Sequence, residues 1–286
     1  MAVPVNQGAD PRNAVEEIEA DLLLEALYRR FGTDLRALER APLRARLLAF
    51  MQGRSLASLS ALQAQALHDE AVGLELVRCL SVRPAALFDD PARIVTLRQT
   101  LRPWLRSCPV ARVWVSECTG VEDVYTLAIL LREEGFYDKT LLFATAASET
   151  MLNAARSGRI PVAEFGRYQQ NYLRSGGRYS LADYLEAEPD EEGRLVFRPE
   201  LGRNIIWAQY NLATDASFNE FQLIVCRGAL SDLRPAMRQR ALKLFHESLA
   251  VFGYLSVHPD DAMGHLPNDV DFRAVHAASG LYRRVA

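Results

Sequence analysis

The feature that most constrains the fold is an alternation of short apolar runs with amphipathic segments between residues 92 and 257. The apolar runs have the length and the β-branched or aromatic content of buried strands. The segments between them repeat apolar residues at three and four positions, as helices do. Strands that alternate with helices form largely parallel sheets covered by helices. The sequence therefore predicts an α/β fold with a doubly wound, mostly parallel sheet.

Each expected element can be placed on the chain. The expected strands are 112–116, 141–144, 204–210, 221–226 and 254–257, and the expected helices are 92–105, 122–134, 148–157 and 235–252. In open sheets of this kind, ligands bind beyond the carboxyl ends of the strands. The candidate ligand site therefore comprises the loops at 115–121, 145–148, 211–213 and 226–230.

Two further regions lie outside this pattern. Residues 1–12 have no apolar period and predict a flexible tail, whereas residues 13–80 predict a small helical domain. We expect its first helix to bury a single apolar face that holds Val15, Ile18, Leu22, Ala26, Leu23 and Leu27. Between about 165 and 203 the α/β alternation stops, which predicts an inserted antiparallel subdomain within the domain at 81–286.

Charge and cysteine content exclude several classes of protein. The formal net charge is −3, so nucleic acid is not an expected partner. The chain has no run of about 18 uncharged apolar residues and no secretory signal pattern, so we expect no membrane insertion. Cys79, Cys108, Cys118 and Cys226 form no C-x-x-C pair, so we expect buried free thiols, no metal site and a cytoplasmic protein.

Residues 28–54 hold seven arginines against two acids, an excess of five positive charges. Three of these arginines, Arg40, Arg44 and Arg46, lie on the expected second helix. The pattern fits a solvated helix face, and it also fits a docking surface for an acidic partner.

Several segments carry a family resemblance. They are YRRFGTDLR at 28–36, RVWVSECTGVEDVYTLAILLREEG at 112–135, QNYLRSGGRYSLADY at 170–184, NLATDASFNEFQLIVCR at 211–227 and ALKLFHESL at 241–249. Together they resemble the CheR-type chemoreceptor methyltransferases, which methylate receptor glutamates with S-adenosylmethionine. The resemblance implies a small N-terminal helical domain, a Rossmann-like methyltransferase domain and an inserted β-subdomain.

The resemblance implies a glycine-rich cofactor motif at 114–126, where the family reads W-x-A-G-C-S-T-G-E-E-x-Y-S. Glu117 and Val121 replace its two glycines. Gly120 stands one residue out of register, and Glu122 is retained. Glycine is needed where a backbone approaches a ligand closely or takes a positive φ. We therefore expect this loop to fit the cofactor poorly.

After the second strand the family reads A-T-D-I-[DN], and the resemblance implies that its acid binds the cofactor ribose. Ala146 stands at that position, and a methyl group accepts no hydrogen bond. The family's N-L pair, which also borders the implied cofactor pocket, remains as Asn211 and Leu212.

The implied substrate side is altered as well. Asp89 replaces a family arginine that would hold the substrate carboxylate as a bidentate pair. In the motif C-R-N-V-L-I-Y-F, Arg227 is retained, whereas Gly228 and Asp232 replace the asparagine and the active-site tyrosine. The family's catalytic positions are thus occupied by Asp89 and Asp232, and we expect no catalytic residue here.

The changes concentrate at the strand tips, whereas the residues that form strands and core match the family. We therefore expect a CheR-like pseudoenzyme that needs no cofactor and regulates chemosensory-type signalling by binding a protein. The expected partner is a receptor-like helix, a signalling protein or a sister methyltransferase, bound through Arg40, Arg44 and Arg46.

Two alternatives stay open. One is an active S-adenosylmethionine-dependent protein-glutamate O-methyltransferase with an atypical site. The other is a pocket retuned to a different small ligand, made acidic by Glu117, Asp89 and Asp232.

Overall fold

The computed structural model describes residues 11–81, 85–259, 261, 263 and 270–285. Contacts between residues divide the chain into two units, residues 1–82 and 83–286. The predicted tail at 1–12 lies outside the described residues except for Pro11 and Arg12, which begin the first helix. None of the helices in the described part of the chain is long and apolar enough to cross a membrane.

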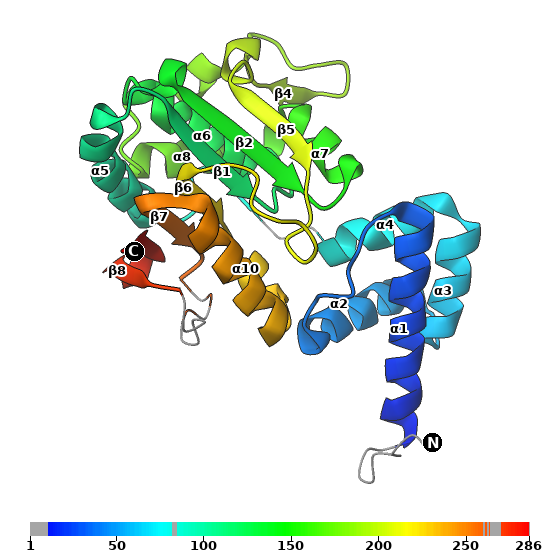
Figure 1. Ribbon diagram of the computed structural model, residues 1–286. Helices are drawn as coiled ribbons and strands as arrows, with labels where there is room; N and C mark the ends of the chain where they lie inside the picture. The colour runs from blue at the N-terminus through cyan, green and yellow to red at the C-terminus, as the bar shows by residue number, and fades with distance from the viewer. Residues whose placement is uncertain (1–10, 82–84, 260, 262, 264–269, 286) are drawn as a thin grey trace. The chain divides into compact units, whose positions relative to one another are not determined.

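The N-terminal unit consists of four helices (Figure 1). They are α1 (Pro11–Phe31), α2 (Arg40–Gly53), α3 (Leu59–His68) and α4 (Glu70–Ser81). α3 begins where its sequence provides a cap, because the Ser58 side chain accepts a hydrogen bond from the Ala61 N–H. The core of this unit contains leucines from all four helices, among them Leu27, Leu43, Leu62 and Leu76.

The predicted apolar face of α1 is wrong in part. Leu23 and Leu27 are fully buried, whereas Val15, Ile18 and Leu22 are 57%, 60% and 55% exposed. At 100° per residue these three form a stripe that is separated from the buried face by more than a quarter turn. The three consecutive leucines at 22–24 lie on both the exposed and the buried face of α1. For this reason the sequence pattern suggested a single apolar face where the helix has two.

The second unit contains the predicted sheet. Its seven strands are β1 (Ala111–Ser116), β2 (Thr140–Ala146), β5 (Ile205–Gln209), β6 (Phe221–Cys226), β7 (Leu249–Val257), β8 (Phe272–His276) and β9 (Leu281–Arg284). They lie in the order β5-β2-β1-β6-β7-β9-β8. The first five are parallel, and β9 and β8 continue the sheet in antiparallel pairing (Figure 1). The α/β, Rossmann-like prediction is therefore confirmed.

Helices pack on both faces of this sheet. The second unit contains α5 (Pro91–Ser107), α6 (Glu122–Glu133), α7 (Glu149–Arg156), α8 (Phe165–Arg174), α9 (Ala229–Asp232) and α10 (Pro235–Ser248), with short 3₁₀ turns at 137–139, 162–164, 181–184, 199–201 and 277–279. Val113 and Val115 of β1 join the core that α5 and α6 cover. Trp114 points to the opposite face, where its ring lies 5.4 Å from that of Phe245 of α10.

Three predicted boundaries differ clearly from the structure. The helix expected to reach residue 252 ends at Ser248, and β7 begins at Leu249 rather than at Tyr254. Leu249 is fully buried and pairs with Phe221 of β6, so tertiary packing favours the strand. In the inserted region, β3 (Arg159–Pro161) pairs antiparallel with β4 (Arg194–Val196), and its first strand lies before residue 165.

Candidate functional site

The loop after β1 contains one strained residue. Glu117 has a φ of +55°, in the left-handed region that favours glycine. Val121 has a φ of −73° and caps α6 without such strain. The expectation that a positive φ requires glycine at both of these positions is therefore wrong for Val121. The Cys118 N–H donates to the Thr145 carbonyl at 2.7 Å, which ties this loop to the end of β2.

A pocket of about 290 Å³ opens at the carboxyl ends of β1 and β6. Five residues of the predicted site line it, namely Glu117, Asp89, Arg227, Gly228 and Asp232. Asp123 of α6 also lines it. Four carboxylates therefore surround one guanidinium, so the pocket is acidic on balance.

Arg227 is held by two of these carboxylates. Its Nη1 lies 3.0 Å from Asp123 Oδ1, and its Nη2 lies 2.9 Å from Asp89 Oδ2. Burial opposes the charge of this side chain, but the two carboxylates outweigh it and raise the pKa of Arg227. The residue that reverses the family's charge, Asp89, thus forms an ion pair within the chain. Asp123 was missed because only the fold brings it to Arg227.

A second buried arginine was also missed. Arg93 of α5 is 4% exposed, and its Nη1 donates to Ser256 Oγ of β7 at 3.1 Å. Burial lowers the pKa of Arg93 to about 10, and the nearby Arg227 charge acts in the same direction. An arginine in the first turn of an amphipathic helix is typical of a surface position, so the sequence carried no signal for this contact.

Ala146 ends β2 and is fully buried. Its methyl group packs with Met151 and Leu152 of α7 and with the partly buried Trp207. Its carbonyl accepts a hydrogen bond from the Tyr210 N–H at 2.9 Å. The end of β2 therefore presents an apolar cluster rather than a hydrogen-bond acceptor.

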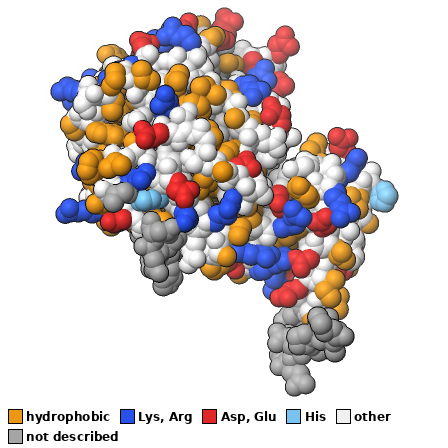
Figure 2. Space-filling model, viewed as in Figure 1, with side chains coloured by type: hydrophobic (Ala, Val, Ile, Leu, Met, Phe, Trp, Pro, Cys, Tyr) orange, Lys and Arg blue, Asp and Glu red, His pale blue; other side chains and the backbone are white. Residues whose placement is uncertain are grey.

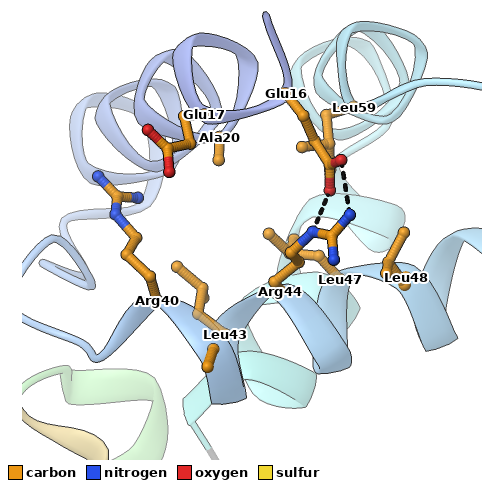
Figure 3. Close-up of a pocket in the computed structure, with 10 residues that line it drawn as sticks. Glu16, Glu17, Ala20, Arg40, Leu43, Arg44, Leu47, Leu48 and Leu59 are labelled. Carbon is orange, nitrogen blue, oxygen red and sulfur yellow. Dashed lines mark hydrogen bonds and ion pairs between the residues drawn. The ribbon is translucent and has the colours of Figure 1, made fainter. Parts of the chain in front are cut away.

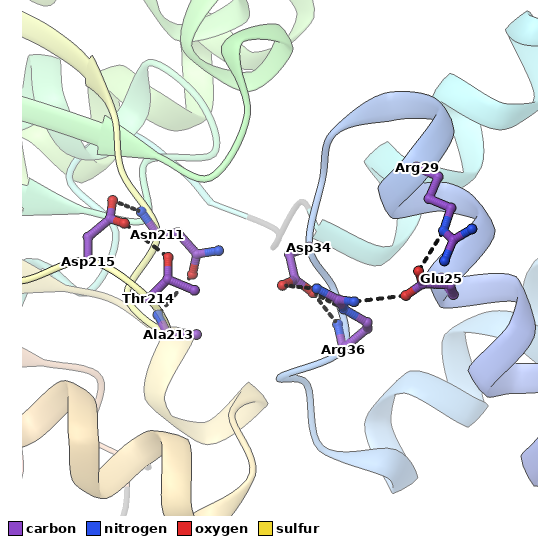
Figure 4. Close-up of polar contacts among 8 residues, drawn as sticks. All are labelled: Glu25, Arg29, Asp34, Arg36, Asn211, Ala213, Thr214 and Asp215. Carbon is purple, nitrogen blue, oxygen red and sulfur yellow. Dashed lines mark hydrogen bonds and ion pairs between the residues drawn. The ribbon is translucent and has the colours of Figure 1, made fainter.

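Asn211 and Leu212 lie in a tight turn after β5, and Asn211 is drawn with Ala213 and Asp215 in Figure 4. Asn211 Oδ1 accepts the Ala213 N–H at 2.8 Å, and the Asn211 N–H donates to Asp215 Oδ2 at 3.0 Å. Leu212 is buried. The retained N-L pair therefore serves the turn itself, because the amide oxygen of Asn211 accepts from its own loop.

Glu122 begins α6 and lies below the surface. The Tyr168 hydroxyl, from α8 of the inserted region, donates to Glu122 Oε1 at 3.3 Å. Burial raises the pKa of the Glu122 carboxyl, and the neighbouring Asp123 adds to the effect. A Cβ added at Gly120 would collide with Glu122 Oε2, and neither residue lines the acidic pocket beside Arg227.

Comparison with known proteins now identifies the family. Residues 85–278 match the family model described as "CheR methyltransferase, SAM binding domain". The chain is 35% identical over 239 residues to the putative methyltransferase Cher3 of Pseudomonas putida, a match that covers 84% of this chain and 86% of that protein. The chain belongs to the CheR methyltransferase family.

A second relative is less similar to this chain. Chemotaxis protein methyltransferase 1 of Pseudomonas aeruginosa is 24% identical over 254 residues, which covers 84% of this chain and 87% of that protein. Among solved structures, an S-adenosylmethionine-dependent methyltransferase from Geobacter sulfurreducens with bound S-adenosylhomocysteine is 15% identical, with a TM-score of 0.33. That match covers 62% of this chain and about half, 51%, of the Geobacter chain.

The residues present at the strand tips do not fit S-adenosylmethionine as the CheR motifs would hold it. No carboxylate stands at the end of β2, where Ala146 is sealed among apolar side chains. The Arg227 guanidinium already binds Asp123 and Asp89. Within the described ranges, no three His, Cys, Asp or Glu side chains are grouped to hold a metal ion.

The three arginines that were predicted to bind a partner, Arg40, Arg44 and Arg46, all form contacts within the helical unit. Arg44 binds Glu16 of α1 through Nε at 2.5 Å and Nη2 at 2.8 Å, and Arg40 pairs with Asp21. A slot of about 280 Å³ lies between α1 and α2 beside these side chains (Figure 3). The acids of α1 thus offset the positive excess, and partner binding by these arginines stays a prediction.

Arg46 has a different role from its two neighbours on α2. Its Nη1 donates to the Leu80 carbonyl at 2.9 Å, at the end of α4. This contact links α2 to α4 within the helical unit. Arg46 therefore contributes to packing as well as to the charge of the helix.

Proposed function

We propose that this CheR-family chain does not bind S-adenosylmethionine and acts as a non-catalytic protein that binds a protein partner in chemosensory-type signalling. The observation that carries the proposal is the buried environment of Ala146, whose methyl group packs against Met151, Leu152 and Trp207. A ribose placed at this strand tip would meet carbon atoms where the family supplies a carboxylate.

The loss of the ribose acceptor at Ala146 can be expressed as a loss of affinity for S-adenosylmethionine. A hydroxyl that loses its partner on burial costs about 1–3 kcal/mol, so the two ribose hydroxyls together cost about 2–6 kcal/mol. Each 1.4 kcal/mol lowers affinity about tenfold, which corresponds to a loss of about 30-fold to more than 10⁴-fold. A cofactor that binds with a Kd of about 1 μM in an intact site would then bind with a Kd between about 30 μM and more than 10 mM.

The acidic pocket supports the second part of the proposal, the absence of glutamate methylation. Asp89 and Asp232 occupy the family's substrate-side positions, and both line the pocket with Glu117 and Asp123. A glutamate carboxylate that entered beside them would experience like-charge repulsion, which disfavours binding in a partly desolvated site. The only guanidinium among the residues that line this pocket, Arg227, is already bound by two carboxylates.

One observation favours a second candidate function. The same four carboxylates would suit a small cationic ligand such as an amine, held where the family holds its reactants. The two candidates predict different results. If an amine binds in this pocket, it should raise the free energy of unfolding of the wild-type chain, and Asp232→Asn should remove that increase.

Ultraviolet cross-linking of tritiated S-adenosylmethionine to the purified chain tests the proposal. We expect no saturable labelling that excess S-adenosylhomocysteine removes. The Asp89→Arg/Glu117→Gly/Ala146→Asp variant, which restores three family residues, provides the comparison for any residual labelling. Saturable labelling of the wild-type chain that S-adenosylhomocysteine displaces would overturn the proposal.

A further inference from the structure

The outer side of α1 carries an apolar stripe that the helical unit does not cover. Val15, Ile18 and Leu22 are spaced by three and four residues, and each is more than half exposed. Scattered exposed apolar residues are common, but three in helical register form a continuous ridge. Their spacing is that of the a, d and a positions of a heptad, the pattern of a helix–helix seam.

The charged residues of α1 itself around this stripe are all acidic, and Arg36, Arg40 and Arg44 pair with three of them. Between Val15 and Glu25 the chain holds five carboxylates and no lysine or arginine. In the heptad register, Glu19 takes an e position and Asp21 a g position, so they flank the stripe on its two sides. In Figure 2, hydrophobic and acidic side chains lie next to each other near this end of the helical unit.

The present partners of these carboxylates can be exchanged at low cost. Asp21 is 64% exposed and pairs with Arg40, while Glu19 accepts a hydrogen bond from the Ser60 N–H at 3.3 Å. Glu25 pairs with Arg29 and Arg36 at 2.7 and 2.8 Å in the network drawn in Figure 4. Exposed ion pairs contribute about 0–1 kcal/mol each, so a ligand that brings its own cations loses little by replacing them.

We propose that the stripe of α1 is a docking surface for a basic amphipathic helix of a partner protein. Apolar residues at the a and d positions of that helix would cover Val15, Ile18 and Leu22, and its lysines or arginines at e and g would pair with Glu19 and Asp21. This inference rests on the proposed binding function and names the surface and the chemistry of the partner. It is separate from the arginine face of α2, which would select an acidic partner.

The charge pattern also disfavours a second copy of this chain as the occupant. In an antiparallel pair of α1 helices, e positions face e positions and g positions face g positions. Glu19 would then lie opposite Glu19 of the other copy, and Asp21 opposite Asp21. Like charges in these positions destabilise the pair, whereas a basic helix satisfies both sides.

The probe for this proposal is a labelled three-heptad peptide with leucine at a and d and lysine at e and g. Its control is the same peptide with glutamate at e and g. Fluorescence anisotropy with the full chain at about 0.15 M salt is expected to give micromolar binding of the lysine peptide and about tenfold weaker binding of the glutamate peptide. Glu19→Gln/Asp21→Asn should reduce that difference.

Two single variants test whether the peptide binds at the stripe or elsewhere on the surface. Ile18→Ser should weaken binding of the lysine peptide by at least about tenfold, because it removes an apolar side chain that the peptide would bury. Val162→Ser, a change of a similarly exposed residue in the other unit, should leave the affinity unchanged. Circular dichroism of both variants checks that the helices are intact.

Several outcomes would overturn the proposal. They are equal affinity for the two peptides, no binding of the lysine peptide at about 1 mM, or unchanged binding by Ile18→Ser. A dimer in sedimentation that Ile18→Ser dissolves would assign the stripe to a second copy instead. An affinity gain of more than about tenfold on deleting residues 1–10 would assign it to the chain's own terminus. None of these results depends on S-adenosylmethionine, so this proposal and the loss of cofactor binding fail separately.

Discussion

At the scale of single residues, the two positions where the family has glycine differ in physical character. Glu117 adopts the left-handed conformation that a glycine takes without strain, whereas Val121 adopts an ordinary one. Only Glu117 therefore pays a conformational penalty in the folded state. The carboxylate of Glu117 also lines the acidic pocket.

The first prediction follows from this contrast. Glu117→Gly should raise the free energy of unfolding by about 1 kcal/mol, because it relieves a left-handed conformation at a residue with a Cβ. Val121→Gly should lower it by about 2 kcal/mol, because it removes a buried side chain and adds backbone freedom. Urea unfolding of both variants measures whether each substitution raises or lowers the free energy of unfolding. A stability loss in Glu117→Gly would contradict the strain assigned to this residue.

The second prediction concerns pH. Burial raises the pKa of Glu122 in the folded chain above the ordinary value of a glutamate, so folding favours the protonated carboxyl. The stability that Glu122 contributes is present below its unfolded pKa and is lost as pH rises through the folded pKa. Glu122→Gln stays neutral, so its free energy of unfolding minus that of wild type should rise as pH increases from about 4 to 8.

Urea unfolding across this pH range checks the prediction for Glu122. Glu149→Gln, on the exposed side of α7, controls for the loss of one negative charge. A difference between Glu122→Gln and wild type that does not change with pH, or that falls as pH rises, would contradict the buried environment of this carboxyl.

At the scale of elements, a buried carboxylate at the end of α6 anchors the inserted region. The Glu133 side chain is fully buried, and the Tyr184 hydroxyl donates to its Oε1 at 3.0 Å. The Tyr172 hydroxyl donates to the same oxygen, and Arg98 Nη2 of α5 lies 2.8 Å from Oε2. One glutamate therefore links α5 and α6 to α8 and to the 3₁₀ turn at Tyr184.

The third prediction tests this anchor. Glu133→Ala should lower the free energy of unfolding by about 2–6 kcal/mol, because the Tyr172 and Tyr184 hydroxyls lose their acceptor while Arg98 keeps its pair with Glu134. Limited proteolysis should then cut the inserted region at 159–203 earlier than in wild type. Glu149→Ala, which removes an exposed ion pair, should change the stability by less than about 0.5 kcal/mol. Equal effects of the two substitutions would show that the Glu133 contacts do not hold the insertion.

The elements also show how far a sequence can predict this fold. β1, β2 and β6 could be placed because their buried residues leave a nearly continuous apolar pattern, and β5 could be placed from its run of Ile205, Ile206 and Trp207 although it is an edge strand. β8 could not, because only Phe272 among its five residues is buried and an edge strand needs no apolar alternation. The turn from α10 into β7 was misplaced because Leu249 fits either a helix or a strand until Phe221 pairs with it.

For the candidate site, the sequence predicted which residues lie at the carboxyl end of the sheet. It did not predict which of these residues contact one another. Glu117, Asp89 and Arg227 were expected near one another, and the structure brings them into one pocket. The pairing of Arg227 with Asp123 and the burial of Arg93 depend on helices packing across the sheet. Such contacts join residues that are more than 100 positions apart, so no local pattern signals them.

At the scale of the whole molecule, the two units have separate cores. All buried apolar residues of the helical core lie between Leu23 and Leu80, and those of the main sheet core lie between Ala86 and Leu281. A unit whose core uses only its own residues can fold alone, although a helical unit of this size is only marginally stable.

The fourth prediction is that the chain can be divided at this boundary. Fragments 1–82 and 83–286 should each fold when made alone, the first with a helical circular dichroism spectrum and the second with a single cooperative urea transition. The fragment 83–286 should unfold within about 1 kcal/mol of the same unit in the full chain. A fragment 83–286 that lacks a cooperative transition would show that its core depends on the helical unit.

The measurement that tests the central claim most directly is a calorimetric titration of the purified full chain with S-adenosylmethionine and with S-adenosylhomocysteine. Because Ala146 offers no acceptor and Arg227 is bound by Asp89 and Asp123, the account predicts no saturable heat up to about 1 mM of either ligand. Saturable binding at micromolar concentration would contradict it and would restore the reading of this chain as a methyltransferase with an atypical site.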